Sequence, residues 1–141
     1  METFKIVIFK LGEEEYGLNI DYVQSIERIL PITRVPNTHE YVKGVINLRG
    51  NVTPVIDLRK RLNQGETLYS DHARIIISKY DDIELGLIVD QTSDVMDISN
   101  EDLEEATATG IDFDAFGGVV NKDGRLIILI KLDELTKTAL I

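Results

Sequence analysis

Cysteine is absent from this 141-residue chain, and proline occurs only three times. Without cysteine there is no disulfide scaffold, thiolate zinc site, iron–sulfur cluster or cysteine nucleophile. No apolar run approaches the roughly 18 residues that a membrane-spanning helix needs, and the N-terminus carries no signal-peptide core. These absences exclude the disulfide-rich secreted and membrane-spanning classes, so we expect an ordinary globular domain.

Positive charge is also scarce, because 15 Lys and Arg stand against 25 Asp and Glu. A net charge of −10 argues against binding to nucleic acid or to an anionic membrane, since both need cations that meet phosphates. The charge is unevenly distributed. Seven basic residues fall between Arg28 and Arg61, whereas Tyr80 to Asn121 contains no Lys or Arg. This division is consistent with two surfaces for different protein partners, or with ordinary solvated faces.

Short β-branched and aromatic runs separated by turn residues predict an all-β fold of barrel or sandwich type. The expected strands are Phe4–Leu11, Glu15–Ile20, Val23–Leu30, Val42–Leu48, Val52–Leu58, Arg74–Lys79, Ile83–Val89, Val119–Val120 and Leu126–Ile130. Helices are predicted to be short. One follows Asp57 as its cap, and Ser99 with Asp102 resembles a capping box. A C-terminal helix is indicated by an apolar face of Leu132, Leu135, Ala139 and Leu140.

Catalytic and metal-binding signatures are weak. His39 and His72 have no second ligand at a useful spacing, and there is no nucleophile elbow, phosphate loop or dinucleotide fingerprint. Asp112, Asp114 and Asp123 supply only half of a calcium-loop pattern. We therefore predict no catalytic residue, no metal and no cofactor. Two alternatives stay open: a small hydrolase using carboxylates such as Asp90 and Asp94, or another small acidic β-barrel interaction module.

One segment between Val23 and Ile32 is crowded with apolar residues. Val23, Ile26, Ile29, Leu30 and Ile32 lie there beside Pro31 and Pro36. Core packing explains such a segment, and so does a groove for a partner, because apolar patches rimmed by charge are typical of protein interfaces.

The run Gly44-Val45-Ile46-Asn47-Leu48-Arg49-Gly50, followed by Pro54-Val55-Ile56-Asp57-Leu58, resembles the CheW-like domain family. Matching segments continue through Glu14–Ile20, Val23–Ile26, Gly86–Asp90, Ser93–Val95 and Ile127–Leu132. The resemblance therefore covers residues 1–141 as a single CheW-like domain. It implies two packed five-stranded SH3-like β-barrels, with residues 14–80 in the first barrel and residues 1–13 plus 81–141 in the second.

The same resemblance implies a non-enzymatic chemotaxis adaptor. Members of the family couple the cytoplasmic tips of chemoreceptors to the regulatory domain of the histidine kinase CheA. The expected protein is cytoplasmic, is recruited to membrane-associated receptor arrays without inserting into the membrane, is a monomer alone, and forms rings with CheA.

Site residues follow from the resemblance position by position. Those expected to bind the receptor or support its groove are Val23, Gln24, Ile26, Gly44, Arg49 and Val95. Those expected to contact the kinase are Ser25, Glu27, Arg28, Ile29, Leu30, Ile32 and Val35. Many relatives have Glu at the position of Ser25, which puts a charge-dependent kinase contact there in question.

Two of these residues also have a local argument. Gly44 interrupts a strand pattern, which indicates a bulge or a close backbone approach. Arg49 stands beside a Gly-Asn turn, where its rigid fork of donors can brace the hairpin or contact a receptor.

Overall fold

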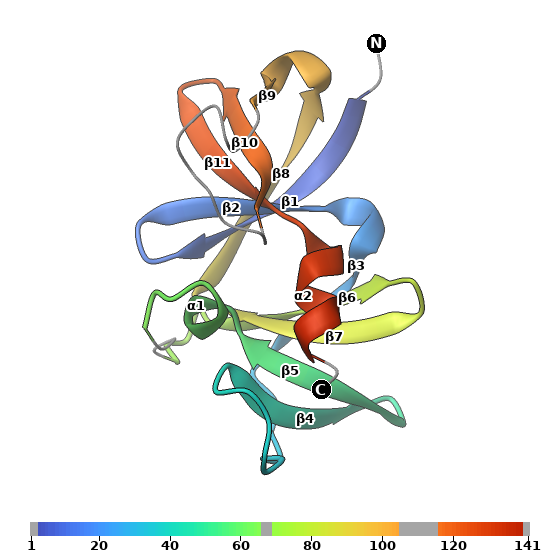
Figure 1. Ribbon diagram of the computed structural model, residues 1–141. Helices are drawn as coiled ribbons and strands as arrows, with labels where there is room; N and C mark the ends of the chain where they lie inside the picture. The colour runs from blue at the N-terminus through green and yellow to red at the C-terminus, as the bar shows by residue number, and fades with distance from the viewer. Residues whose placement is uncertain (1–2, 66–68, 105–115, 140–141) are drawn as a thin grey trace.

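The structure is a computed structural model that describes residues 3–65, 69–104 and 116–139 (Figure 1). Strands form two sheets. The six-stranded sheet has the order β8 (Gln91–Ser99), β1 (Thr3–Leu11), β2 (Glu14–Asn19), β11 (Arg125–Ile130), β10 (Phe116–Lys122), β9 (Leu103–Glu104). The five-stranded sheet has the order β3 (Val23–Arg28), β6 (Arg74–Tyr80), β7 (Ile83–Val89), β5 (Asn51–Asp57), β4 (Val42–Leu48). The all-β prediction is confirmed.

Each sheet curls toward a barrel through a short local connection. In the five-stranded sheet, Thr33 beyond the end of β3 pairs with Val45 of β4, at N···O distances of 2.8 and 2.9 Å. In the six-stranded sheet, β8 leads through a 3₁₀ turn, η2 (Asn100–Asp102), into β9, which pairs with β10. In each sheet, the first and last strands of the order are thus brought together, as closure of an SH3-like barrel requires.

The expected boundary between the barrels needs a correction. The resemblance predicts β2 in the first barrel, but β2 pairs with β1 and β11 of the six-stranded sheet. It predicts β7 in the second barrel, but β7 pairs with β6 and β5 of the five-stranded sheet. Both strands belong to tight hairpins, β1–β2 and β6–β7, and each expected boundary cut through one of them. The chain crosses between sheets instead at η1 (Ile20–Tyr22) and at Asp90.

The predicted helices form at their capping residues. Helix α1 (Leu58–Arg61) starts after Asp57, whose carboxylate accepts a hydrogen bond of 3.1 Å from the Arg59 N–H. Before η2, the Ser99 N–H donates to Asp102 at 2.9 Å, which completes the capping box. Helix α2 (Leu132–Ala139) buries Leu132 and Leu135, and Leu140 lies outside the described residues. Strand β8 was not predicted, because its sequence is polar and only weakly alternating.

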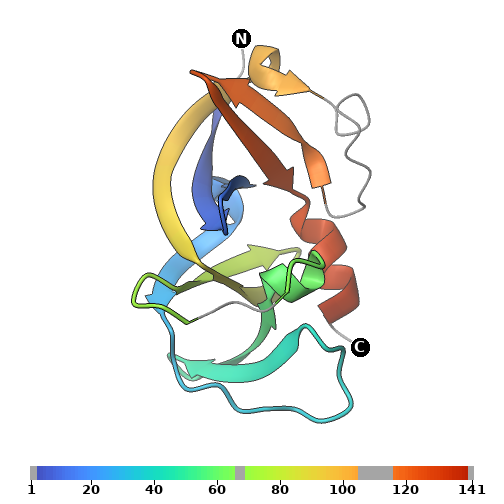
Figure 2. The same cartoon turned by 90° about the vertical axis from the view of Figure 1, so that its left-hand side faces the viewer.

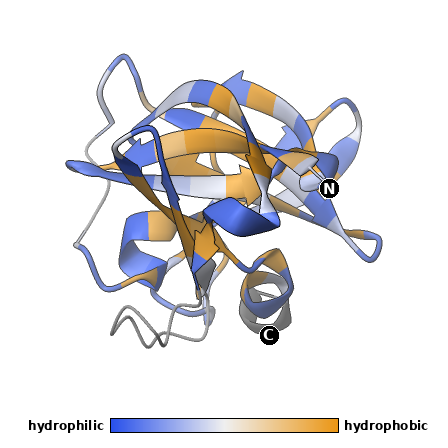
Figure 3. Ribbon diagram, turned by 90° about the horizontal axis from the view of Figure 1, so that it is seen from above, coloured by the Kyte–Doolittle hydropathy of each residue, from blue (hydrophilic) through white to orange (hydrophobic). Residues whose placement is uncertain are grey.

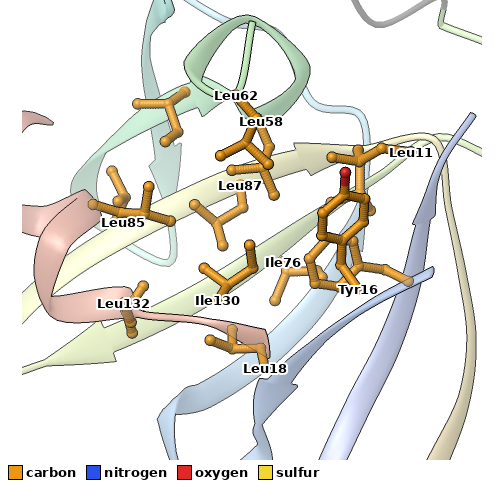
Figure 4. Close-up of a cluster of buried hydrophobic side chains, with 14 residues drawn as sticks. Leu11, Tyr16, Leu18, Leu58, Leu62, Ile76, Leu85, Leu87, Ile130 and Leu132 are labelled. Atoms are coloured by element: carbon orange, nitrogen blue, oxygen red, sulfur yellow. The ribbon is translucent and has the colours of Figure 1, made fainter. Parts of the chain in front are cut away.

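Within the described residues, three apolar clusters form the core. One lies within the six-stranded barrel (Ile6, Ile8, Ile98, Val120, Ile127), and another lies within the five-stranded barrel (Ile46, Val55, Ile75, Ile77, Ile88). The largest joins the barrels, with 14 buried residues from both sheets, α1 and α2 (Figure 4). Consecutive residues of β6 therefore face different cores. Ile75 and Ile77 lie in the core of the five-stranded barrel, whereas Ile76 lies in the cluster that joins the barrels. Figure 3 shows the alternating hydropathy that results along the strands.

The shared cluster gives the two barrels a common core. Each large apolar side chain that is fully buried contributes about 1.5–3 kcal/mol, and helix α2, which lies beside the junction in Figure 2, adds two such side chains.

Among the described residues, no helix is long and apolar enough to cross a membrane.

Candidate functional site

A groove runs between the two barrels, where β1 and β8 of one sheet meet β3 of the other. Its cavity volume is about 410 Å³. In Figure 2, β8 curves down from its own barrel toward this junction. The groove is lined by Val7, Ile8, Ile20, Val23, Ser25, Ile26, Thr92, Ser93, Asp94 and Val95. The wall is largely aliphatic, and a polar strip from β8 forms one edge.

Three of the residues expected to bind the receptor meet in this groove, although they are far apart in the sequence. Val23 and Ile26 come from β3, and Val95 comes from β8. Ile26 is 42% exposed and Val95 is 51% exposed, so both offer apolar surface to a partner. Burial alternates along β3, and a register shift between Val23 and Ser25 interrupts its pairing with β6, so that Val23 and Ile26 both line the groove.

Ser25 also lines this groove, although the resemblance placed it among the kinase contacts. Its hydroxyl oxygen is buried and has no hydrogen-bond partner among the described residues. Gln24 is exposed on β3 and does not line the groove.

Gly44 and Arg49 lie outside the groove. Gly44 is buried in β4 at φ 145°, beside a register shift between Val42 and Gly44. A Cβ at Gly44 would lie 2.1 Å from the carbonyl oxygen of Thr33. The predicted bulge and close backbone approach are therefore both present, and they serve the contact that closes the five-stranded barrel.

Arg49 occupies the tight turn between β4 and β5 at φ 51°, a left-handed conformation that non-glycine residues seldom adopt. Its guanidinium lies 3.7 Å from the Glu27 carboxylate, and its side chain is 73% exposed. The hairpin tip thus reaches back to β3, while most of the Arg49 side chain stays free to contact another molecule.

Apart from Ser25, the residues expected to contact the kinase divide among three environments. Ile29, Leu30 and Ile32 pack against the core of the five-stranded barrel, so core packing accounts for much of their apolar surface. Arg28 at the end of β3 is exposed, and Val35 is 37% exposed. Glu27 is half-buried and paired with Arg49.

The polar edge of the groove was not predicted from the sequence. Thr92, Ser93 and Asp94 line it just before Val95. The Asp94 carboxylate accepts hydrogen bonds of 2.9 and 3.0 Å from Arg125, which also pairs with Glu15. The resemblance had matched Ser93–Val95, and that match was the one signal in the sequence that pointed to this edge.

The two carboxylates considered for a hydrolase are both held by arginines. Burial of Asp90 opposes its ionisation, but hydrogen bonds from Arg59 and from the Gly12 N–H outweigh burial and lower its pKa. Hydrogen bonding from Arg125 lowers the pKa of Asp94. A general acid needs the opposite shift, so neither carboxylate is tuned to donate a proton.

Metal coordination finds no support in the part of the chain that the structure describes. It contains no group of three His, Asp or Glu side chains placed to hold an ion. Asp112 and Asp114 of the partial calcium pattern lie outside the described residues.

Comparison with known proteins places the chain in a family. The CheW-like domain model matches residues 5–139. The chemotaxis protein CheW of Bacillus subtilis is 43% identical over 129 residues, which cover 89% of this chain and 82% of that protein. The CheW of Klebsiella aerogenes is 34% identical over 133 residues, covering 93% and 80% of the two chains.

A solved structure agrees with these sequence matches. The crystal structure of the scaffolding protein TtCheW from Thermoanaerobacter tengcongensis superposes with a TM-score of 0.86 at 40% identity, covering 92% of this chain and 90% of that chain. These relatives are named as chemotaxis and scaffolding proteins and not as enzymes. The resemblance predicted from the sequence is confirmed, and the chain belongs to the CheW-like domain family.

Proposed function

We propose that this protein is a chemotaxis adaptor that couples the cytoplasmic tips of chemoreceptors to the regulatory domain of the histidine kinase CheA. The observation that carries the proposal is the inter-barrel groove, in which Val23, Ile26 and Val95 are gathered from two sheets. A scaffold needs at least two separate contact surfaces, and the groove supplies one of them.

The groove is the surface that we assign to the receptor. Its exposed aliphatic side chains offer apolar area that a partner helix can bury, and the polar strip of β8 supplies hydrogen-bonding groups at one edge. Gly44 and Arg49 act as supports of the barrel that carries β3, since neither lines the groove.

The kinase surface is assigned to the far end of β3 and the segment that follows it. Arg28 and Val35 are its most accessible members. Glu27, Ile29, Leu30 and Ile32 hold this segment against the first barrel. The basic residues between Arg28 and Arg61 favour an acidic patch on the kinase domain. Ser25 lines the groove, so we expect it to affect receptor binding more than kinase binding.

In the cell, we expect the protein to be a cytoplasmic monomer that joins rings with CheA at receptor arrays. Titration calorimetry against the regulatory domain of a cognate CheA, and separately against a soluble receptor-tip fragment, tests the proposal. Saturable one-to-one binding with a negative heat-capacity change is expected in both titrations, because apolar surface is buried.

A lack of heat and of co-elution with both partners at high concentration would contradict the proposal. It would favour the alternative of another interaction module on the same acidic β-barrel fold. Binding to only one of the two partners would contradict the coupling role while leaving the other contact in place.

A further inference from the structure

A polar cluster outside the groove connects the two barrels. Arg59 in α1 of the five-stranded barrel donates to the Asp90 carboxylate from Nε at 2.9 Å and from Nη2 at 2.5 Å. The same carboxylate accepts a hydrogen bond of 2.7 Å from the N–H of Gly12, in the β1–β2 turn of the six-stranded barrel. One carboxylate is therefore held from both barrels.

Asp90 occupies a crossing point of the chain. It is the one residue between β7 of the five-stranded sheet and β8 of the six-stranded sheet. Its own N–H donates to the carbonyl of Lys10 at 3.1 Å, which adds a second bond to the β1–β2 hairpin. Thr92, two residues later, already lines the groove.

Gly12 fits this arrangement closely. It has φ 63°, and a Cβ there would lie 3.4 Å from Nη2 of Arg59. The turn therefore presents its N–H to Asp90 while leaving room for the guanidinium.

The cluster adds a directional contact to the shared apolar core. Apolar burial is itself non-directional, because its free energy depends on the area removed from water. A two-pronged arginine–carboxylate pair has a defined geometry. The side chains of Arg59 and Asp90 are 23% and 21% exposed, so water competes for them only in part.

We propose that Arg59 is a positioning residue whose bond to Asp90 fixes the placement of the two barrels and so the width of the groove between β3 and β8. The structural part of this inference stands without any partner. Its consequence for receptor binding rests on the proposed function.

A matched control exists within one barrel. Arg125 makes comparable paired bonds to Asp94 and Glu15, and all three residues belong to the six-stranded sheet. Removing its guanidinium deletes an interaction of the same chemistry that joins residues of one barrel only. Because its partner Asp94 also lines the groove, Arg125→Gln is the control for the distance measurement and not for receptor binding.

The experiment measures distances between spin labels by pulsed spectroscopy. Because the chain has no native cysteine, the labels attach only at the introduced cysteines. Lys79→Cys in β6 and Asn121→Cys in β10 place one label on an exposed site of each barrel. A second pair, Lys79→Cys with Asn47→Cys in β4, reports on the five-stranded barrel alone. Both pairs are measured in the parent, Arg59→Gln, Arg59→Lys and Arg125→Gln backgrounds.

Arg59→Gln is expected to broaden or shift the distance between barrels while leaving the distance within one barrel unchanged. The inter-barrel distance distribution of Arg59→Lys should lie between those of Arg59→Gln and the parent, because lysine keeps the charge but not the paired donors of the guanidinium. Arg125→Gln should give the same distances as the parent for both label pairs. An unchanged inter-barrel distance in Arg59→Gln overturns the inference, and so does a broadening of both label pairs, which would show that Arg59 only stabilises its own barrel.

Receptor binding gives the functional measurement. Where the parent binds a receptor-tip fragment, Arg59→Gln should weaken that affinity about threefold to thirtyfold, the range for residues that act on a site from outside it. Unchanged affinity despite altered barrel placement would overturn the link to the groove. A parent that does not bind would contradict the proposed function, while the distance measurement would still decide the structural inference.

Discussion

The backbone of Thr33 lies directly against Gly44, so that a Cβ at Gly44 would stand 2.1 Å from the Thr33 carbonyl oxygen. Thr33 also exchanges two backbone hydrogen bonds with the neighbouring Val45. The first barrel is closed at this point, by a contact between backbones that leaves no room for a side chain.

Substitution of Gly44 should therefore destabilise the fold before it affects any interface. Gly44→Ala is expected to lower the free energy of unfolding by at least about 2 kcal/mol, because it adds a backbone clash to an unfavourable φ. Gly44→Asp should cost more. Denaturant unfolding measures both. Gly50→Ala is the control, since it also has a positive φ but nothing within 4 Å, and should cost about 1 kcal/mol. Equal costs at the two positions would contradict this account.

The assignment of the groove to the receptor can be tested by placing a charge in the groove without changing the buried core. Val95→Asp should weaken binding of a receptor-tip fragment by tenfold or more, about 1.4 kcal/mol, because it places a carboxylate on half-exposed apolar surface. Val52→Asp is the matched control, since Val52 is 69% exposed on β5 and does not line the groove. Calorimetry measures the affinity, and melting curves should be similar for both variants. A loss of binding in Val52→Asp as large as in Val95→Asp would contradict the assignment of the groove.

Two variants of Arg49 distinguish an effect on the turn between β4 and β5 from the loss of a contact with the receptor. Arg49→Gly removes the side chain and also relieves the left-handed conformation, so it should stabilise the turn by roughly 0.5–1 kcal/mol. Arg49→Ala keeps the strain and loses an exposed ion pair that is worth at most about 1 kcal/mol. Because Arg49 supports the barrel that carries β3, receptor coupling should follow stability, so that Arg49→Ala weakens coupling more than Arg49→Gly does. An equal loss of coupling in both variants, despite opposite changes in stability, would contradict this and indicate a direct receptor contact.

The Arg59–Asp90 pair should give a defined dependence of stability on pH. Burial opposes ionisation of Asp90, but hydrogen bonds from Arg59 and Gly12 bring its pKa below the ordinary value of 3.8. The unfolded chain therefore takes up this proton at a higher pH than the folded chain. The stabilisation is present above about pH 4 and is lost as the pH falls through the folded-state pKa.

Melting temperatures of the parent and of Asp90→Asn, followed from neutral pH downward, check this. The difference between them should be constant near neutrality and should shrink below about pH 4. Asp97→Asn is the control, because its pair with Lys5 is largely exposed and screened. A difference between parent and Asp90→Asn that does not change with pH would contradict the role of this carboxylate.

The sequence by itself determined the local elements and the family. β-branched runs predicted the strands, Asp57 and Ser99 marked helix starts, and the run from Gly44 to Gly50 identified the relatives. These features depend on neighbours along the chain, where backbone preference and capping act. The polar strand β8 was missed because its pairing with β1 depends on residues more than 80 positions away.

Only the tertiary structure decided which residues meet. It moved β2 and β7 to the opposite barrels, brought Val23 and Ile26 to Val95, and kept Gly44 and Arg49 out of the groove. It also joined Arg59, Asp90 and Gly12 across the two barrels. Sheet order and side-chain pairing result from packing two curved sheets on one shared core, and no local pattern encodes which strand edges are left to form a groove.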